Sequence, residues 1–187
     1  MFKRNFKVVG QGLSKNTKLW IAKVTLLAFF ISLILSIFSE LIQNSNNIFI
    51  AITILIIFMA LNVLSDMVGL AITSCQIENI ENSNFSDKLK NKCLMLIKNA
   101  DKVSSIMCDV IGDICGILCG VSGTIIVYMV SKSIEIYSLK IFIGAGMSAL
   151  IAGLTVFFKA ISKNFAVNNA QKIVKKIGNF LLKFSKK

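Results

Sequence analysis

Three aspartates interrupt long apolar stretches of this 187-residue sequence. Asp66 lies in a stretch from about residue 47 to residue 74, and Asp109 and Asp113 lie near the start of a stretch from about residue 103 to residue 131. A carboxylate in apolar surroundings takes up a proton, pairs with a basic group or binds a cation, because an unpaired charge there is costly. In a helix, Asp109 and Asp113 would share one face. These residues are the first candidates for a functional site.

Hydroxyl oxygens accompany the carboxylates. Ser65 precedes Asp66, and Ser104 and Ser105 lie about one helical turn before Asp109. Hard cations such as Mg²⁺ bind carboxylate, hydroxyl and amide oxygens, and Mg²⁺ often keeps part of its water shell. We predict a cation site with the ligands Asp66, Asp109, Asp113, Ser65, Ser104 and Ser105.

A structural role is the alternative for the same aspartates. They would then cap helices, lie outside the apolar layer or pair with lysines. Lys102 and Lys159, at the boundaries of apolar stretches, are the basic residues close enough to reach them.

The sequence contains no histidine, and its five cysteines form no CxxC pair. Imidazole-based catalysis and zinc ligation by histidine are therefore excluded. We also find no nucleophile–base pair, glycine-rich phosphate loop or metalloprotease motif, so we expect no enzyme and no organic cofactor. Cys108, Cys115 and Cys119 offer soft-metal ligands, but the favoured interpretation is that they act as small apolar residues.

Four apolar stretches must position these residues: 19–38, 47–74, 103–131 and 141–158. Each has about the length needed to cross a bilayer, and each is continuous rather than alternating, which favours helices over strands. Hydrophobic residues make up 55% of the chain, more than one soluble core of this size would bury. We predict an all-α integral membrane protein with four transmembrane helices and one or two amphipathic helices on the cytoplasmic face.

The lysines predict how these helices are oriented. They concentrate before residue 19, between residues 88 and 102, and after residue 158, whereas the other two loops hold only Lys132 and Lys140. Basic segments stay in the cytoplasm, so four crossings place both termini there, in a multi-pass plasma-membrane protein. The same topology explains the net charge of +12 without a nucleic-acid partner. It also places all three aspartates at a similar depth in the cytoplasmic half of the bilayer.

Two segments are amphipathic. Apolar residues share one helical face over residues 85–97 and again over 173–184, with lysines opposite. We expect both helices on the inner membrane surface, with the lysines toward anionic headgroups. A partner-binding or calmodulin-like target helix is the alternative.

Gly112, Gly116 and Gly120 recur at every fourth residue. Small residues on one helix face permit close helix approach, so we expect tight packing or dimerisation here. A backbone-carbonyl ligand is the less favoured alternative.

From about residue 61 to residue 176, the chain resembles the transmembrane (DUF21) domain of the CNNM/CorB/CorC magnesium transporter family. Residues 64–74 (LSDMVGLAITS) are similar to the family's FSxSETALTS segment, and residues 99–105 (NADKVSS) to its NPDRLLS segment. Residues 158–170 are similar to its GExLPK exit from the last membrane helix. A family serine falls on Asp66, the family's SET glutamate on Gly69, and the GExLPK glutamate on Lys159.

The resemblance implies a homodimer with an inward-facing cavity that binds Mg²⁺. It places ligands at Asp66, Ser104 or Ser105, and Asp113. The family's CBS and CorC-type cytoplasmic domains have no counterpart here, so we expect no nucleotide-regulated gating, although a separate cytoplasmic regulatory subunit can replace them. Residues 1–45 form a basic tail and an extra transmembrane helix, and residues 46–187 form the matched domain with an amphipathic basic C-terminal helix.

These observations predict a divalent-cation (Mg²⁺ or Co²⁺) transporter-like membrane protein. A regulatory or scaffolding membrane protein that keeps the fold without transport is the first alternative, favoured by Gly69 and Lys159. A pore-forming protein is the second, and the interior carboxylates count against it.

Overall fold

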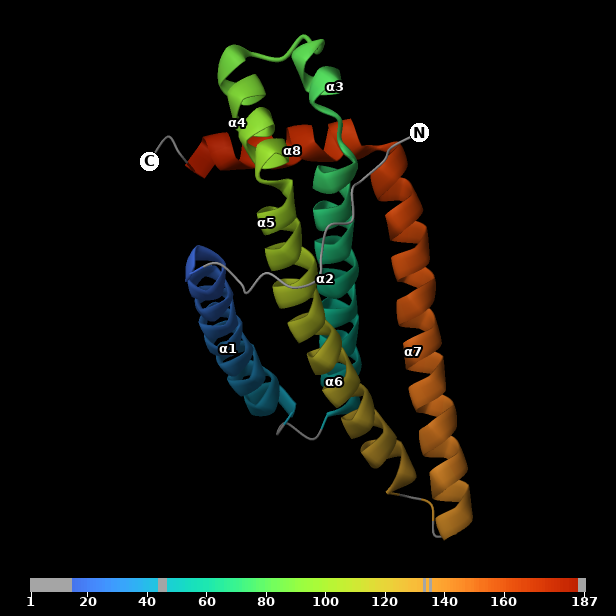
Figure 1. The fold of residues 1–187 in the computed structure, drawn as a ribbon. Helices are drawn as coiled ribbons and strands as arrows, with labels where there is room; N and C mark the ends of the chain where they lie inside the picture. Colours follow the sequence, from blue (N-terminus) through green and yellow to red (C-terminus); the bar gives the residue numbers. More distant parts are fainter. Residues whose placement is uncertain (1–14, 44–46, 133, 135, 185–187) are drawn as a thin grey trace, which may run out of the picture.

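The computed structural model describes residues 15–43, 47–132, 134 and 136–184, and these ranges contain helices and no strand. Four long helical segments run side by side, and shorter helices gather at one end (Figure 1). In chain order the helices are α1 (Lys15–Gln43), α2 (Ile48–Ser74), α3 (Ile77–Glu81), α4 (Asp87–Lys98), α5 (Ala100–Ser105), the π-helical segment η1 (Ile106–Gly112), α6 (Asp113–Ser131), α7 (Tyr137–Asn168) and α8 (Ala170–Phe184).

The all-helical prediction is confirmed, as are four helices long and apolar enough to cross a membrane. These segments are Leu19–Ile37, Ile48–Ser74, Ala100–Ser131 and Tyr137–Asn168. α7 continues past the predicted apolar limit at residue 158 and carries Lys159 and Lys163 on helical backbone. The helix therefore extends beyond its apolar part, because hydropathy marks a change of surroundings rather than a helix end.

α2 is the central element of the bundle. Its N-terminus is fixed by Asn47, whose side chain accepts a hydrogen bond of 3.0 Å from the Phe49 backbone N–H. α2 contacts α5, η1, α6, α7 and α8. Its buried apolar side chains pack mainly against the third long segment, in a core formed by Ala51, Ile54, Leu55, Phe58, Met59, Val110, Ile114, Cys115, Leu118, Cys119 and Ile126.

The glycine stripe of the third segment explains how closely α2 approaches it. A Cβ added to Gly116 would lie 3.0 Å from Asn62 Nδ2, and Gly112 is similarly close to α2. A Cβ on Gly120 would meet nothing within 4 Å. The predicted tight packing is therefore found at Gly112 and Gly116 and is absent at Gly120.

α4 and α8 form a smaller unit at the end of α2. α8 runs across the direction of α2 (Figure 1), and its apolar face packs against α4 in a second core. Lys175 Nζ lies 4.7 Å from the centre of the Phe85 ring, which adds a cation–π contact. This core consists of Ile72, Cys75, Ile80, Leu89, Cys93, Ala170 and Val174. The apolar faces that we expected on the membrane surface thus pack largely against protein, while Phe180 and Leu181 remain exposed.

α1 is the most peripheral of the long helices. It contacts α2, η1 and α6, and no residue in its most apolar window is fully buried. Partly buried side chains of one face, Val24, Ala28, Ile31 and Leu35, pack on the central core.

Candidate cation site

Asp66 lies on the face of α2 that is turned toward α7, and it is buried. Lys159 of α7 reaches it, with Nζ 3.0 Å from Asp66 Oδ2. Of the two lysines that the sequence left open as partners, Lys159 is therefore the one that forms the ion pair. The extension of α7 past residue 158 as a continuous helix positions this side chain.

A cavity of about 280 Å³ opens beside this ion pair. All three predicted aspartates and one predicted serine line it. The complete lining is Asp66, Leu70, Ser104, Cys108, Asp109, Asp113, Lys159 and Lys163. The lining thus holds three carboxyl groups and two lysine amino groups.

The other two predicted serines have different surroundings. Ser65 is buried in α2, and it lines neither this cavity nor the second cavity described below. Ser105 donates a hydrogen bond of 2.7 Å to Asp109 Oδ2, so it orients a carboxylate of the cavity without lining the cavity itself.

The third long segment is not a regular α-helix where it carries these residues. Residues Ile106–Gly112 form η1, which contains Asp109 and ends directly before Asp113. The expectation of one regular α-helical turn between the two aspartates is therefore wrong. Both side chains are nevertheless exposed and line the same cavity. π-helical turns are rare and frequently occur at functional sites.

Three oxygen atoms converge on Gly112 at the end of η1. A Cβ added there would lie 3.0 Å from Asp66 Oδ1, 3.4 Å from the Met107 carbonyl oxygen and 3.7 Å from Asn62 Oδ1. Because glycine has no Cβ, Gly112 lets the side chains of Asp66 and Asn62 approach the η1 backbone closely. We call this arrangement of Asp66 Oδ1, Asn62 Oδ1 and Met107 O the oxygen cradle.

Asn62 Oδ1 is the most unusual of these oxygens. Asn62 is only 2% exposed, and this atom has no hydrogen-bond partner among the described residues. Buried polar atoms in folded proteins are nearly always hydrogen-bonded to protein or to ordered water. A water molecule, another proton donor or a cation would satisfy Asn62 Oδ1.

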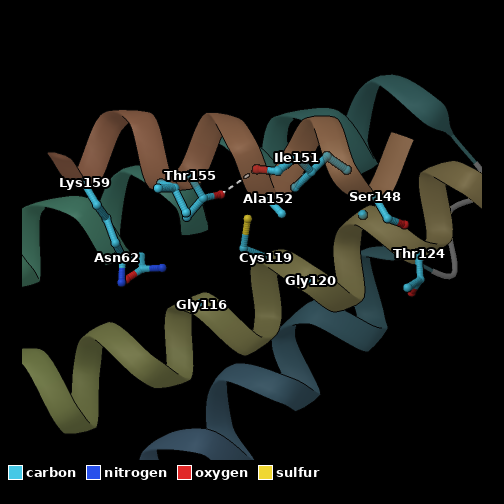
Figure 2. A pocket seen from close by; sticks show the side chains of 12 residues that line it. Asn62, Gly116, Cys119, Gly120, Thr124, Ser148, Ile151, Ala152, Thr155 and Lys159 are labelled. Carbon is cyan, nitrogen blue, oxygen red and sulfur yellow. Dashed lines mark hydrogen bonds between the residues drawn. The ribbon is translucent and has the colours of Figure 1, made fainter. Parts of the chain in front are cut away.

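A second cavity of about 360 Å³ adjoins the first along α6 and α7. Figure 2 shows Lys159 extending from α7 toward Asn62 at one end of it, and both residues line its wall. Further along, the Thr155 hydroxyl donates a hydrogen bond of 2.8 Å to the Ile151 carbonyl oxygen. Lys159 lines both cavities, so the ion pair with Asp66 stands between them.

The donor atoms suit a hard, partly hydrated cation better than a soft or tightly caged one. Within the described ranges, no three histidine, cysteine, aspartate or glutamate side chains come close enough to hold one metal ion. A cation here would rely on one carboxylate, amide and carbonyl oxygens, and water. Mg²⁺ accepts such a shell, because it dehydrates reluctantly and usually takes only one or two carboxylates from the protein.

The cysteines of the third segment have a packing role. Cys115 and Cys119 are buried against α2, and Cys119 Sγ lies 3.9 Å from the Leu55 carbonyl oxygen. Cys108 Sγ lies 3.9 Å from the Asp66 carbonyl oxygen. All are free thiols, as the apolar interpretation of these residues predicts.

The sequence indicates the carboxylates and places Asn62 among the oxygen donors near them, but it does not indicate the oxygen cradle. Asn62 precedes Asp66 by one helical turn, a spacing that placed both on one face of α2 and could have indicated a joint site. The Met107 carbonyl gave no signal, because its position beside Gly112 depends on the π-helical backbone.

The fold and the site define a class: an all-helical protein with four helices long and apolar enough to cross a membrane, and with polar oxygens between α2, η1 and α6. No protein-family model, curated protein or solved structure matches the chain.

Proposed function

We propose that the four long helices cross a plasma membrane with both termini in the cytoplasm. Large apolar side chains cover the outward surfaces of α1 and α7, including Phe29, Phe30, Phe142 and Phe157, which are more than half exposed. In water such a surface would be unstable, whereas lipid covers it at no cost. The distribution of lysines supports this orientation.

We infer further that the protein transports a divalent cation, with Mg²⁺ as the leading candidate and Co²⁺ as the second. The observation that carries this inference is the oxygen cradle, in which a buried, unpartnered amide oxygen faces a carboxylate oxygen across Gly112. The adjoining cavity, with its three aspartates, would attract a cation to the cradle. Resemblance to the CNNM/CorB/CorC transmembrane domain is a second support, and it extends the proposal to a homodimer.

In this proposal Lys159 acts as a tethered cation. Its ammonium group neutralises Asp66 when no ion is bound, because an unpaired carboxylate between apolar helices is costly. An entering cation replaces Lys159 as the partner of the Asp66 carboxylate, and Lys159 moves toward one of the two cavities that it lines. Ser104 and water would complete the coordination shell, with Asp109 and Asp113 at the entrance.

Ion flux tests this function directly. The full chain is reconstituted in liposomes that contain a Mg²⁺-sensitive dye, and flux is compared between the parent, Gly112→Ala and Gly120→Ala. A methyl group at Gly112 fills the oxygen cradle, so we expect flux to be lost. The same change at Gly120 meets open space, so flux should stay at the parental level.

The double variant Asp109→Asn/Asp113→Asn tests the cavity in the same assay. It keeps the size of both side chains and removes two negative charges, so we expect Mg²⁺ flux to fall at least tenfold. If a folded double variant and folded Gly112→Ala both move Mg²⁺ as fast as the parent, the proposed site is wrong.

The ion pair itself favours a second candidate, a regulatory or scaffolding membrane protein that does not transport. Lys159 already satisfies Asp66 at 3.0 Å, and a permanent pair would hold α2 and α7 together without any ion. Calorimetry separates the two functions, since a scaffold would show neither Mg²⁺ binding nor flux. Leakage of a large dye from the same liposomes would instead indicate a pore.

A further inference from the structure

A groove of about 550 Å³ lies at the same end of the bundle as α8, away from both cavities of the cation site. It is bordered by the end of α4, the beginning of α5 and the second half of α8. Its lining consists of Lys92, Met95, Leu96, Asn99, Lys102, Val103 and Leu181.

The lining combines exposed apolar side chains with basic side chains. Met95 and Leu181 are 60% and 37% exposed, although both are apolar. Lys92 and Lys102 stand beside them, and neither forms an ion pair with any residue that the structure describes. Exposed apolar side chains next to unpaired ammonium groups complement an amphiphile with an anionic head.

The groove is also placed where such an amphiphile would be found. Lys102 and Val103 belong to α5, which begins the third of the four long apolar segments. If these segments cross a bilayer, as proposed above, the beginning of α5 lies at the level of the lipid headgroups. A lipid chain held there can continue along the partly exposed side chains of Ile106 and Met107.

We propose that this groove binds one anionic phospholipid of the cytoplasmic leaflet. Its phosphate group lies between Lys92 and Lys102, and an acyl chain covers Met95, Val103 and Leu181. This inference rests on the membrane orientation in the proposed function and is independent of the cation site. Charge complementarity and the position at the membrane surface favour a lipid over an acidic peptide as the occupant.

Native mass spectrometry of the full chain in detergent tests the proposal. The protein is titrated with phosphatidylglycerol and, separately, with phosphatidylcholine of the same acyl chains. We expect the parent to retain one phosphatidylglycerol in preference to phosphatidylcholine. Lys92→Gln/Lys102→Gln should weaken retention about 30-fold, a factor that corresponds to about 1 kcal/mol for each lysine near a lipid headgroup.

Lys88→Gln/Lys98→Gln is the matched control. It removes the same charge from exposed positions on α4 that do not line the groove, so it should keep the parental affinity. Leu181→Asn should weaken retention of both lipids, because it removes apolar contact and leaves both lysines. Glycerol phosphate, which has no acyl chain, should not bind.

Several results would overturn the proposal. Equal retention of the two phospholipids would do so, as would equal losses in the groove variant and its control. Binding of glycerol phosphate or of an acidic peptide as strong as that of phosphatidylglycerol would show a different occupant. The Asp109→Asn/Asp113→Asn variant should keep the lipid preference, so a failure of the cation site and a failure of this groove give different results.

Discussion

At the scale of single residues, the two carboxylate oxygens of Asp66 have different surroundings. Oδ2 forms an ion pair with Lys159 Nζ at 3.0 Å, and Oδ1 faces Gly112 in the oxygen cradle. In the proposed function, a cation would contact Oδ1 and displace Lys159 from Oδ2. We expect a cation and Lys159 to compete for the same negative charge, so that this competition would set the affinity of the proposed site.

Replacement of Lys159 by glutamine should raise the affinity for Mg²⁺. The variant keeps a side chain of similar length and removes the competing charge, so we expect the dissociation constant to fall about tenfold, which is about 1.4 kcal/mol. Isothermal titration calorimetry of the purified protein measures this constant.

Lys163→Gln is the control for this experiment. Lys163 lines the same cavity and forms no ion pair with a described residue, so its removal changes the charge of the cavity without freeing Asp66. Its effect should be the smaller one. Equal effects of both variants would show that overall charge, rather than displacement of Lys159, controls binding.

Hydropathy alone was sufficient to single out the three aspartates, because a charge in an apolar stretch stands out in any sequence. Hydropathy was not sufficient to indicate which groups lie next to these aspartates in the structure. Whether Lys102 or Lys159 reaches Asp66 depends on how α7 approaches α2, and the position of the Met107 carbonyl beside Gly112 depends on π-helical backbone. Both are tertiary or conformational properties that no spacing of residue types encodes.

At the scale of elements, the amphipathic helices also have one property that the sequence indicates and one that it does not. The periodicity of α4 and α8 correctly indicated which faces are apolar. It could not indicate what covers those faces, because lipid and a second apolar helix satisfy the same pattern. In the structure Cys93 of α4 and Val174 of α8 are fully buried at their contact, whereas Met95 of α4 and the second half of α8 expose apolar side chains.

Cys93 makes the packing of α4 on α8 sensitive to pH. Burial, followed by the charge of Cys75, raises the pKa of the Cys93 thiol above its ordinary value of 9.0. The folded protein therefore keeps this proton at pH values where the unfolded chain releases it. The resulting stability is fully present below pH 9.0 and is lost as the pH rises above it, by at most about 1.4 kcal/mol per pH unit.

We expect Cys93→Ala to flatten this dependence. The free energy of unfolding in detergent, measured by denaturant titration between about pH 8 and pH 10.5, should fall less steeply in the variant than in the parent. All other groups are the same in both proteins, so the difference between the two curves isolates the thiol. Parallel curves would contradict the assignment.

At the scale of the whole molecule, the number of long helices and their order could be predicted from the sequence, because apolar stretches of this length are unambiguous. The distribution of the lysines predicts the orientation of these helices as well. Lys88 precedes the third long segment and Lys132 follows it, and both side chains are exposed. These two positions must face opposite sides of the membrane if the segment between them crosses it.

Single cysteines at these positions test the orientation in intact cells. A membrane-impermeant maleimide should label Lys132→Cys from outside and should label Lys88→Cys only after the cells are permeabilised. The parent chain, treated in the same way, gives the contribution of the native cysteines, four of which are buried. Labelling of both positions from the same side would rule out a single crossing between them.

The π-helical segment has a consequence for how this protein should be aligned with others. An α-helix advances by about 100° per residue, and a π-helical turn accommodates roughly one residue more than an α-helical turn. Residues before Ile106 and after Gly112 therefore follow helical phases that differ by about one residue. Relatives whose third segment is regular α-helix would align with it only through a single-residue gap inside the helix, and a comparison that forbids such gaps would match the wrong faces on one side of η1.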